Sequence, residues 1–162
     1  MGHRTPGDVR SAFTGRFADA ARDIDARDQI MLGLPPDRRP EALALAKELG
    51  FTFYVFCAGV DWPEAERMEV LDQVFDPHAL LRLTLRYDLP RTKPVLPSGT
   101  GVYAGANWYE RETYELFGIG FTGHPRLSRL FLPDWFEGHP LRKDFELEAR
   151  VEKPWPGASF EG

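Results

Sequence analysis

Hydrophobic and polar positions alternate along residues 81–89 with a period of two. Leucine and tyrosine occupy the odd positions, while arginine, threonine and aspartate occupy the even ones. This alternation predicts a strand with one buried face and one face in contact with water. The same period over 28–34 predicts a short strand, and a weaker apolar pattern over 68–75 predicts another.

The stretch from Phe51 to Val60 is apolar at both odd and even positions. That pattern predicts a central strand that is covered on both faces. An amphipathic helix is expected at about 9–22, with Asp8 as its N-cap. A second helix is expected from about 37 to 49, where Gly50 ends it.

The expected elements up to residue 89 follow the order α-β-α-β-β-β. Because short turns join the last three strands, we expect antiparallel pairing between them. A loop rich in proline and glycine follows at 90–106, and a short helix is expected at 107–117. We therefore predict an α+β fold, in which helices pack on a small, mostly antiparallel sheet in the order α-β-α-β-β-β-α. The α+β domain is expected to span 1–120, and an extended C-terminal arm that binds a partner is expected at 121–162.

Composition narrows the classes of function. The chain has 162 residues, 43% of them hydrophobic and 28% charged, which fits one soluble globular domain. The single cysteine, Cys57, excludes an internal disulfide and leaves too few thiolates for an iron–sulfur cluster or a cysteine-built zinc site. We expect Cys57 to be an inert core residue. The net charge of −5 argues against nucleic acid as a partner.

No stretch of the sequence predicts a direct link to a membrane. The longest apolar stretch, 51–60, is about half of the ~20 residues that a membrane-spanning helix needs. The first 25 residues are polar and broken by glycine and proline, so no signal peptide is expected there. We therefore expect a cytosolic chain that reaches a membrane only through a partner.

The helix expected at 107–117 has two different sides. Asn107 is the expected N-cap, and Glu110 is placed to reach back to the helix start. Glu110 lies in the apolar arc, where an unpaired charge costs several kcal/mol. A cap or an ion pair is therefore favoured there over catalysis. The polar stripe, expected to be a contact or solvated face, consists of Trp108, Arg111, Glu112 and Glu115.

Two histidines stand in matching Gly-His-Pro turns, fifteen residues apart. With nearby glutamates, His124 and His139 are candidate zinc or iron ligands. Nothing in the sequence holds the two rings toward each other, however. A repeated turn is favoured, because glycine supplies an unusual backbone angle and proline extends the histidine before it. A small metal-dependent enzyme stays open as an alternative.

The C-terminal third is aromatic and basic. Twelve of the 21 aromatic residues lie from Tyr103 onward, interleaved with Arg126, Arg129, Arg142 and Lys143. Aromatic residues and arginine in a segment with little expected regular structure are typical of a protein–protein contact. The alternative, in which these rings cap the core of the domain itself, is equally open on composition alone.

Three stretches resemble the thirty-kilodalton subunit of respiratory complex I, called the C subunit in bacterial NADH–quinone oxidoreductase. Residues 108–117 keep the family pattern W-x-E-R-E-x-x-[DE]-[LM]-[FY]. The paired Gly-His-Pro turns and the Leu-Arg-Lys-Asp run at 141–144 are equally specific. Asp61 and Trp62 also fit the family pattern.

The resemblance implies a cofactor-free subunit in the peripheral part of a proton-translocating NADH–quinone oxidoreductase. Such a protein has no active site of its own and packs, near cluster-bearing neighbours, on the forty-nine-kilodalton subunit, which we call the D-type subunit. The fold of that partner is related to the large subunit of nickel–iron hydrogenases. FMN, iron–sulfur clusters and quinone are expected in the partner subunits, on the cytoplasmic side of the bacterial inner membrane. The same role in a ferredoxin- or F420-linked relative, a membrane-bound hydrogenase or formate hydrogenlyase is the nearest alternative.

The resemblance also marks positions that are expected to serve the interface or the fold. They are Trp108, Glu110, Arg111, Glu112, Tyr114, Phe117, Gly123, His124, Pro125, Glu137, Gly138, His139, Pro140, Leu141, Arg142, Lys143 and Asp144.

Overall fold

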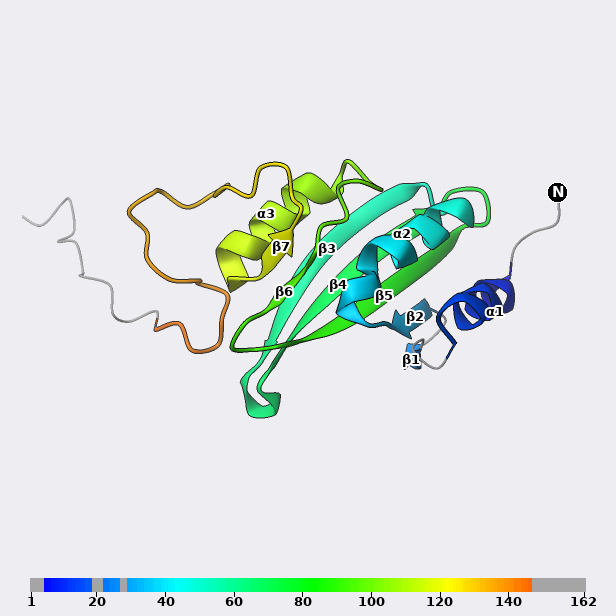
Figure 1. Cartoon of the computed structure of the whole chain (residues 1–162), viewed down its shortest axis with the longest axis horizontal. Helices are drawn as coiled ribbons and strands as arrows, with labels where there is room; N and C mark the ends of the chain where they lie inside the picture. Colours follow the sequence, from blue (N-terminus) through cyan, green and yellow to red (C-terminus); the bar gives the residue numbers. More distant parts are fainter. Residues whose placement is uncertain (1–4, 19–21, 27–28, 147–162) are drawn as a thin grey trace, which may run out of the picture.

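The computed structural model describes residues 5–18, 22–26 and 29–146. Five strands form one sheet in the order β1-β2-β5-β4-β3, and two short strands form a second sheet (Figure 1). The helices are α1 (Pro6–Phe17), α2 (Arg39–Glu48) and α3 (Ala106–Phe117), with single 3-10 turns η2 (Pro36–Arg38) and η3 (Pro63–Ala65). The strands are β1 (Arg22–Ala26), β2 (Gln29–Gly33), β3 (Phe53–Trp62), β4 (Arg67–Asp76), β5 (Leu81–Pro90), β6 (Val95–Pro97) and β7 (Gly120–Thr122).

The predicted α+β class is confirmed. β3, β4 and β5 form an antiparallel meander, as their short connections require. β2 runs parallel to β5, with α2, β3 and β4 between them in the sequence. The alternation along β5 places Leu83, Leu85, Tyr87 and Leu89 in the core, while the residues between them face the other side of the sheet.

The core lies between the sheet and the helices, and α1 contributes Val9, Phe13 and Phe17 to it. α2 and α3 both pack on the same face of the sheet, which we call the inner face (Figure 1). Met68, Val70 and Val74 of β4 point to this face and are fully buried. We call the opposite side the outer face. Its positions alternate with the inner ones along each strand.

β3 differs from its predicted role. The sequence predicted a central strand that is covered on both faces, but β3 is the edge strand of the larger sheet. Its inner side packs on α3, while on its outer side Phe53 and Trp62 are 59% and 44% exposed. The prediction of two covered faces is therefore wrong for the part of the chain described here. An apolar pattern reports how hydrophobic a strand is, and says nothing of what covers it.

The N-terminal elements also differ in their bounds. α1 begins at Pro6 and ends at Phe17, so the helix expected at 9–22 starts earlier and is shorter. Its N-cap is Thr5 instead of Asp8. The Thr5 hydroxyl accepts the Asp8 N–H at 3.3 Å, and the Asp8 carboxylate accepts the Thr5 N–H at 2.8 Å. β1 then follows, a strand that the sequence pattern did not predict.

The segment expected to be a loop at 90–106 contains β6. β6 pairs in parallel with β7, and α3 connects the two strands. After β7, residues 123–146 form no helix or strand, and we call them the covering loop. Residues 147–162, which include the end of the expected arm, lie outside the described residues. No helix among 5–18, 22–26 and 29–146 is long and apolar enough to cross a membrane.

Candidate docking site and the buried network behind it

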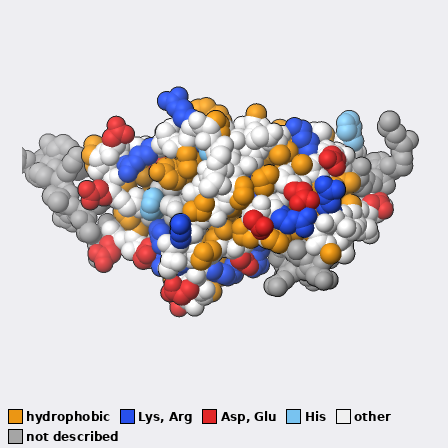
Figure 2. All heavy atoms as spheres, viewed as in Figure 1, with side chains coloured by type: hydrophobic (Ala, Val, Ile, Leu, Met, Phe, Trp, Pro, Cys, Tyr) orange, Lys and Arg blue, Asp and Glu red, His pale blue; other side chains and the backbone are white. Residues whose placement is uncertain are grey.

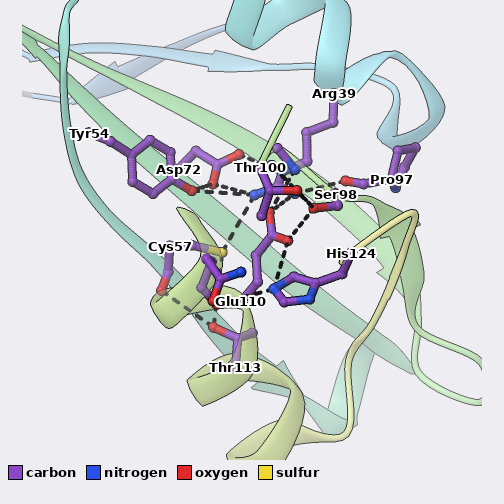
Figure 3. A network of polar contacts seen from close by, with 12 residues as sticks. Arg39, Tyr54, Cys57, Asp72, Pro97, Ser98, Thr100, Glu110, Thr113 and His124 are labelled. Carbon is purple, nitrogen blue, oxygen red and sulfur yellow. Dashed lines mark hydrogen bonds and ion pairs between the residues drawn. The ribbon is translucent and has the colours of Figure 1, made fainter. Parts of the chain in front are cut away.

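One buried arginine joins three parts of the fold. Arg39 is the first residue of α2, and its side chain is 0% exposed. Its guanidinium donates two hydrogen bonds to Asp72 of β4, at 2.7 and 2.8 Å, and one to Glu110 of α3, at 2.7 Å. Figure 3 shows these side chains converging from the helices and the sheet. The arginine therefore connects α2, the sheet and α3 through charge-assisted hydrogen bonds.

Glu110 is held as an ion pair at the centre of this network. Besides Arg39, its carboxylate accepts the Ser98 hydroxyl at 2.6 Å and the Gly99 N–H at 2.7 Å. The sequence left a cap or an ion pair open, and the structure shows the ion pair. The expected N-cap is wrong, because α3 begins at Ala106 after Gly105 and has no side-chain cap. Sequence spacing missed Arg39 as the partner because it lies 71 residues away.

Arg39 keeps its charge while it is buried. Burial lowers the pKa of the Arg39 guanidinium, but the adjacent Asp72 carboxylate outweighs that effect and raises it well above its ordinary value. The Tyr54 hydroxyl donates to Asp72 from β3. Burial raises the pKa of the Cys57 thiol beside them, so this cysteine stays protonated. Cys57 is a buried core residue, as predicted.

The two histidines contact opposite ends of α3. Nδ1 of His124 accepts the Arg126 N–H at 3.0 Å, so its proton lies on Nε2, 3.2 Å from the Asn107 carbonyl oxygen. His139 donates from Nδ1 to the Glu115 carbonyl oxygen at 2.8 Å. The two contact points are eight residues apart, about 12 Å along the helix. The structure therefore does not bring the rings together, and no group of three metal-ligating side chains occurs within the described ranges.

Glu115 binds the covering loop. The sequence placed it on a contact or solvated stripe, but it is only 3% exposed. Its carboxylate accepts the N–H groups of Leu130, Phe131 and Leu132 at 3.0, 2.8 and 2.9 Å. The prediction of a solvated side chain is wrong because the covering loop folds back onto this side of α3. Helical periodicity alone cannot predict that contact.

Arg111, one turn before Glu115 in α3, binds the same loop. It donates to the carbonyl oxygens of Ser128 and Arg129 at 2.9 and 2.7 Å. Its guanidinium also lies 5.0 Å from the centre of the Trp108 ring. Part of the predicted polar stripe thus holds the protein's own loop, while Trp108 remains exposed beside it.

The Leu-Arg-Lys-Asp run closes the loop against the sheet. Asp61 at the end of β3 accepts two hydrogen bonds from Arg91, at 2.7 and 3.0 Å, and the Lys143 N–H at 2.8 Å. Arg91 also pairs with Asp144 at 2.9 Å. Arg142 pairs with Asp144 at 3.3 Å. These contacts fix the end of the covering loop at the edge of the sheet.

The glycines of the two repeated turns have the unusual backbone angle that the sequence predicted. Gly123 and Gly138 have φ values of +79° and +85°, in the left-handed region that favours glycine. Both glycines are exposed. Of the other expected positions, those that are half-buried are Glu112, Tyr114, Phe117 and Pro140. Those that are exposed are Pro125, Glu137, Lys143 and Asp144.

Four large apolar side chains project from α3 and the covering loop. Their exposed fractions lie between 50% and 77%. Figure 2 shows apolar side chains at the surface among acidic and basic ones over this part of the molecule. Exposed aromatic residues are typical of interaction sites. The aromatic surface consists of Trp108, Phe131, Trp135 and Leu141.

Comparison with known proteins identifies the family. Residues 32–151 match the family model described as the respiratory-chain NADH dehydrogenase 30 kDa subunit. The chain belongs to this family. The matched region includes α2, α3 and the whole covering loop. It therefore contains both the buried network and the aromatic surface.

Individual relatives agree with this assignment. The C subunit of NADH-quinone oxidoreductase from Moorella thermoacetica is 38% identical over 133 residues, which are 78% of this chain and 88% of the relative. The corresponding protein from Rhizobium rhizogenes is 41% identical over 111 residues, 68% of this chain. That region is 55% of the Rhizobium protein, so the chain spans about half the length of such relatives.

Two solved structures share the fold. A trypsin-resistant fragment of Nqo5 (residues 1–134 of that protein) is 31% identical, with a TM-score of 0.61 over 74% of this chain and 96% of the fragment. A chain of the archaeal membrane-bound sulfane sulfur reductase has a TM-score of 0.77 over 91% of this chain and 92% of its own length. At 22% identity, the second similarity shows the fold alone.

Removing the charge of Glu115 should release the covering loop. In Glu115→Gln the amide has one acceptor oxygen for three N–H groups, and hydrogen bonds to a charged group contribute about 1.5–3 kcal/mol. We expect hydrogen exchange at Leu130, Phe131 and Leu132 to become at least about tenfold faster, while amides of β5 stay protected. Glu112→Gln, in the same helix, is the matched control and should change none of these rates. Unchanged rates in Glu115→Gln would contradict the role given to this carboxylate.

Acid should release the same loop. Burial raises the pKa of Glu115, but the three loop N–H groups outweigh it and hold the pKa below its usual range. Hydrogen bonds from Arg91 lower the pKa of Asp61, and the Lys143 N–H adds to this effect. Burial opposes it but is outweighed. A lowered native pKa stabilises the folded loop at pH values above the ordinary carboxyl pKa of about 4, and this contribution is lost as the pH falls through the native pKa. NMR shifts of the Leu130, Phe131 and Leu132 amides, which bind Glu115, should therefore stay constant from about pH 7 to 5 and change only below about 4. A change between pH 7 and 5 would contradict this assignment.

Proposed function

We propose that this chain is a cofactor-free structural subunit in the peripheral part of a NADH–quinone oxidoreductase. It docks on the D-type subunit through the aromatic surface. The observation that carries this proposal is that four large apolar side chains are exposed on α3 and on a loop that buried polar groups hold in place. The family assignment supplies the assembly in which such a surface has a partner.

The covering loop is held by polar groups of the chain itself. Glu115 binds its middle, Arg111 binds the segment before that, and Asp61 binds its end. A surface that is ordered in advance loses less conformational entropy on binding than a flexible one. The exposed Trp135 and Phe131 rings are the kind of side chain that supplies most of the binding energy at interfaces.

The polar groups of the network support a structural role. Arg39, Asp72 and Glu110 are fully buried, and Arg39 pairs with both carboxylates. Electron transfer from NADH to quinone then belongs to FMN and iron–sulfur clusters in neighbouring subunits. The chain lies on the cytoplasmic side of the bacterial inner membrane and contacts the membrane only through those subunits.

The division of the chain follows from the same proposal. Residues 1–120 form the α+β domain, and residues 121–162 form the arm that lies on the partner. Within the described residues, the arm contributes three of the four side chains of the aromatic surface, and α3 contributes Trp108. The two parts are joined at the β6–β7 pair, where β7 continues into the covering loop.

Affinity purification of the chain from gently solubilised membranes tests the proposal. We expect an N-terminally tagged chain to bring down a D-type subunit together with antiporter-like membrane subunits. A flavin-bearing NADH-binding subunit in the same sample would identify NADH as the donor. Its absence would favour a ferredoxin-, F420- or hydrogen-linked relative. A chain that purifies alone and monomeric from the soluble fraction would overturn the proposal.

Two substitutions separate assembly from catalysis. Glu112 makes no hydrogen bond or ion pair with another described residue, and Arg142 holds the loop end through Asp144. We expect Glu112→Ala and Arg142→Ala to lower the amount of assembled complex while the turnover of each assembled complex stays nearly normal. Full assembly with lost turnover would instead show a direct catalytic role.

A further inference from the structure

Arg129 organises the turn that carries Trp135. Its Nη1 atom donates to the carbonyl oxygens of Pro133, Asp134 and Phe136, at 2.9, 3.4 and 2.7 Å. Nη1 carries two hydrogens, so the longest of these contacts shares one of them. The Phe136 N–H also closes the turn onto the Pro133 carbonyl oxygen at 2.9 Å. One guanidinium nitrogen therefore binds every residue of the turn at 133–136 except Trp135 itself.

The backbone of Arg129 is itself fixed to α3. Its carbonyl oxygen accepts a hydrogen bond from Arg111 at 2.7 Å, and the three N–H groups that follow it bind the Glu115 carboxylate. From this fixed base the side chain reaches forward four to seven residues along the covering loop. A continuous series of hydrogen bonds thus runs from a core helix to the turn at 133–136.

This turn has little support from the core. Pro133, Asp134 and Trp135 are exposed, and the Trp135 side chain is 77% exposed. Figure 1 shows the covering loop extending beyond α3, on the side away from α2. Within the ranges that the structure describes, the Arg129 guanidinium makes no ion pair, and its hydrogen bonds go to these carbonyl oxygens. Its contacts therefore serve to limit the conformations of the turn.

We propose that Arg129 is a positioning residue for docking. It holds the turn at 133–136 in one conformation and so presents the Trp135 ring to the D-type subunit. The part of Trp135 in an interface rests on the proposed function. Arg129 acts through Trp135 and needs no contact with the partner, because a turn with fewer conformations loses less conformational entropy on binding.

Backbone dynamics of the full chain test the ordering of the turn. In Arg129→Ala we expect the NMR order parameters of the Trp135 and Phe136 amides to fall from about 0.85, typical of rigid backbone, to below about 0.6. Arg126→Ala is the matched control, because this exposed side chain makes no hydrogen bond or ion pair with another described residue. Amides of β5 should stay rigid in both variants. Unchanged order parameters in Arg129→Ala would overturn the proposal.

Recovery of partner subunits with the tagged chain, across a concentration series, tests the docking role. Arg129→Ala should weaken partner binding about fivefold, the effect of losing one ordinary hydrogen bond. Arg126→Ala, which removes the same charge from the same loop, should leave binding unchanged. Equal losses from the two variants would show an effect of charge alone and would contradict the assigned role.

A double variant shows whether Arg129 acts through the tryptophan. In the Trp135→Ala background no ring is left to present, so adding Arg129→Ala should cause no further loss of binding. A further fivefold loss in the double variant would show that Arg129 contacts the partner directly or holds other parts of the loop. Either result would overturn the positioning role.

These measurements separate the proposal from the proposed function. If the D-type subunit is recovered equally well with Arg129→Ala and with the original chain, the proposed function stands and the positioning role is overturned. If the original chain purifies alone and monomeric, the proposed function has failed, and the docking role of Arg129 fails with it.

Discussion

Replacing Arg39 by leucine is expected to destabilise the chain by about 3–5 kcal/mol. The substitution leaves Asp72 and Glu110 buried with no cation between them, because both lose their arginine partner. An uncompensated buried carboxylate is among the most costly defects that a single substitution creates. Urea unfolding, followed by tryptophan fluorescence and by circular dichroism, measures the loss.

The neighbouring arginine provides the matched control. Arg38 pairs with Glu41 in a geometry as close as that of Arg39, but at the surface. Arg38→Leu should therefore cost far less than Arg39→Leu. A second variant tests the cause of the loss. Arg39→Leu combined with Glu110→Gln removes one of the two orphaned charges. The double variant should therefore lose less stability than the sum of the losses in the two single variants. Full additivity would contradict the charge argument.

Truncating Trp135 should have the largest effect on assembly. A tryptophan that dominates an interface typically contributes about 2 kcal/mol or more, so Trp135→Ala should weaken binding to the partner about thirtyfold or more. The free chain should unfold at the same urea concentration as before, because this ring is 77% exposed and packs little against the core. Recovery of partner subunits with the tagged chain, across a concentration series, measures the change.

Leu80 is the control for this second prediction. It is 74% exposed in the turn between β4 and β5, far along the chain from the aromatic surface. Leu80→Ala should leave partner recovery unchanged. Equal losses from Trp135→Ala and Leu80→Ala would show that exposed apolar side chains act non-specifically, and would remove the aromatic surface from the docking site.

Elements with a strong local pattern were predictable from the sequence. The strand at 81–89 and the helix at 107–117 each have an apolar face that repeats along a single element. Periodicity alone therefore predicts both. β6 and β7 have only three residues each, too few for a period to emerge. β1 is short as well, and its Arg-Asp-Ile-Asp-Ala sequence has little of the apolar character that marks a strand.

The partners of the site residues were not predictable in the same way. Helical spacing showed that Glu110 had to be paired, but its partner Arg39 is the first residue of a helix 71 residues earlier. Glu115 was assigned to a contact or solvated face because its helix stripe is polar. Glu115 is buried by a loop that begins to contact it fifteen residues later in the sequence. This loop has no regular structure, so no periodic pattern predicts its path. The family pattern includes both positions without stating what either one contacts, and only Glu110 was among the positions expected to serve the interface or the fold.

The ion pairs of Arg39 also set the order in which the nascent chain can fold. Arg39 leaves the ribosome well before its two carboxylate partners, which lie 33 and 71 residues later. β2 likewise waits for β5, its neighbour in the sheet. Until β4 has been synthesised, α2 cannot bury its arginine without leaving a charge unpaired, and the second ion pair must wait for α3. Folding of the α+β domain is therefore a late event during translation, and fragments that end before Glu110 should remain bound to chaperones or be degraded.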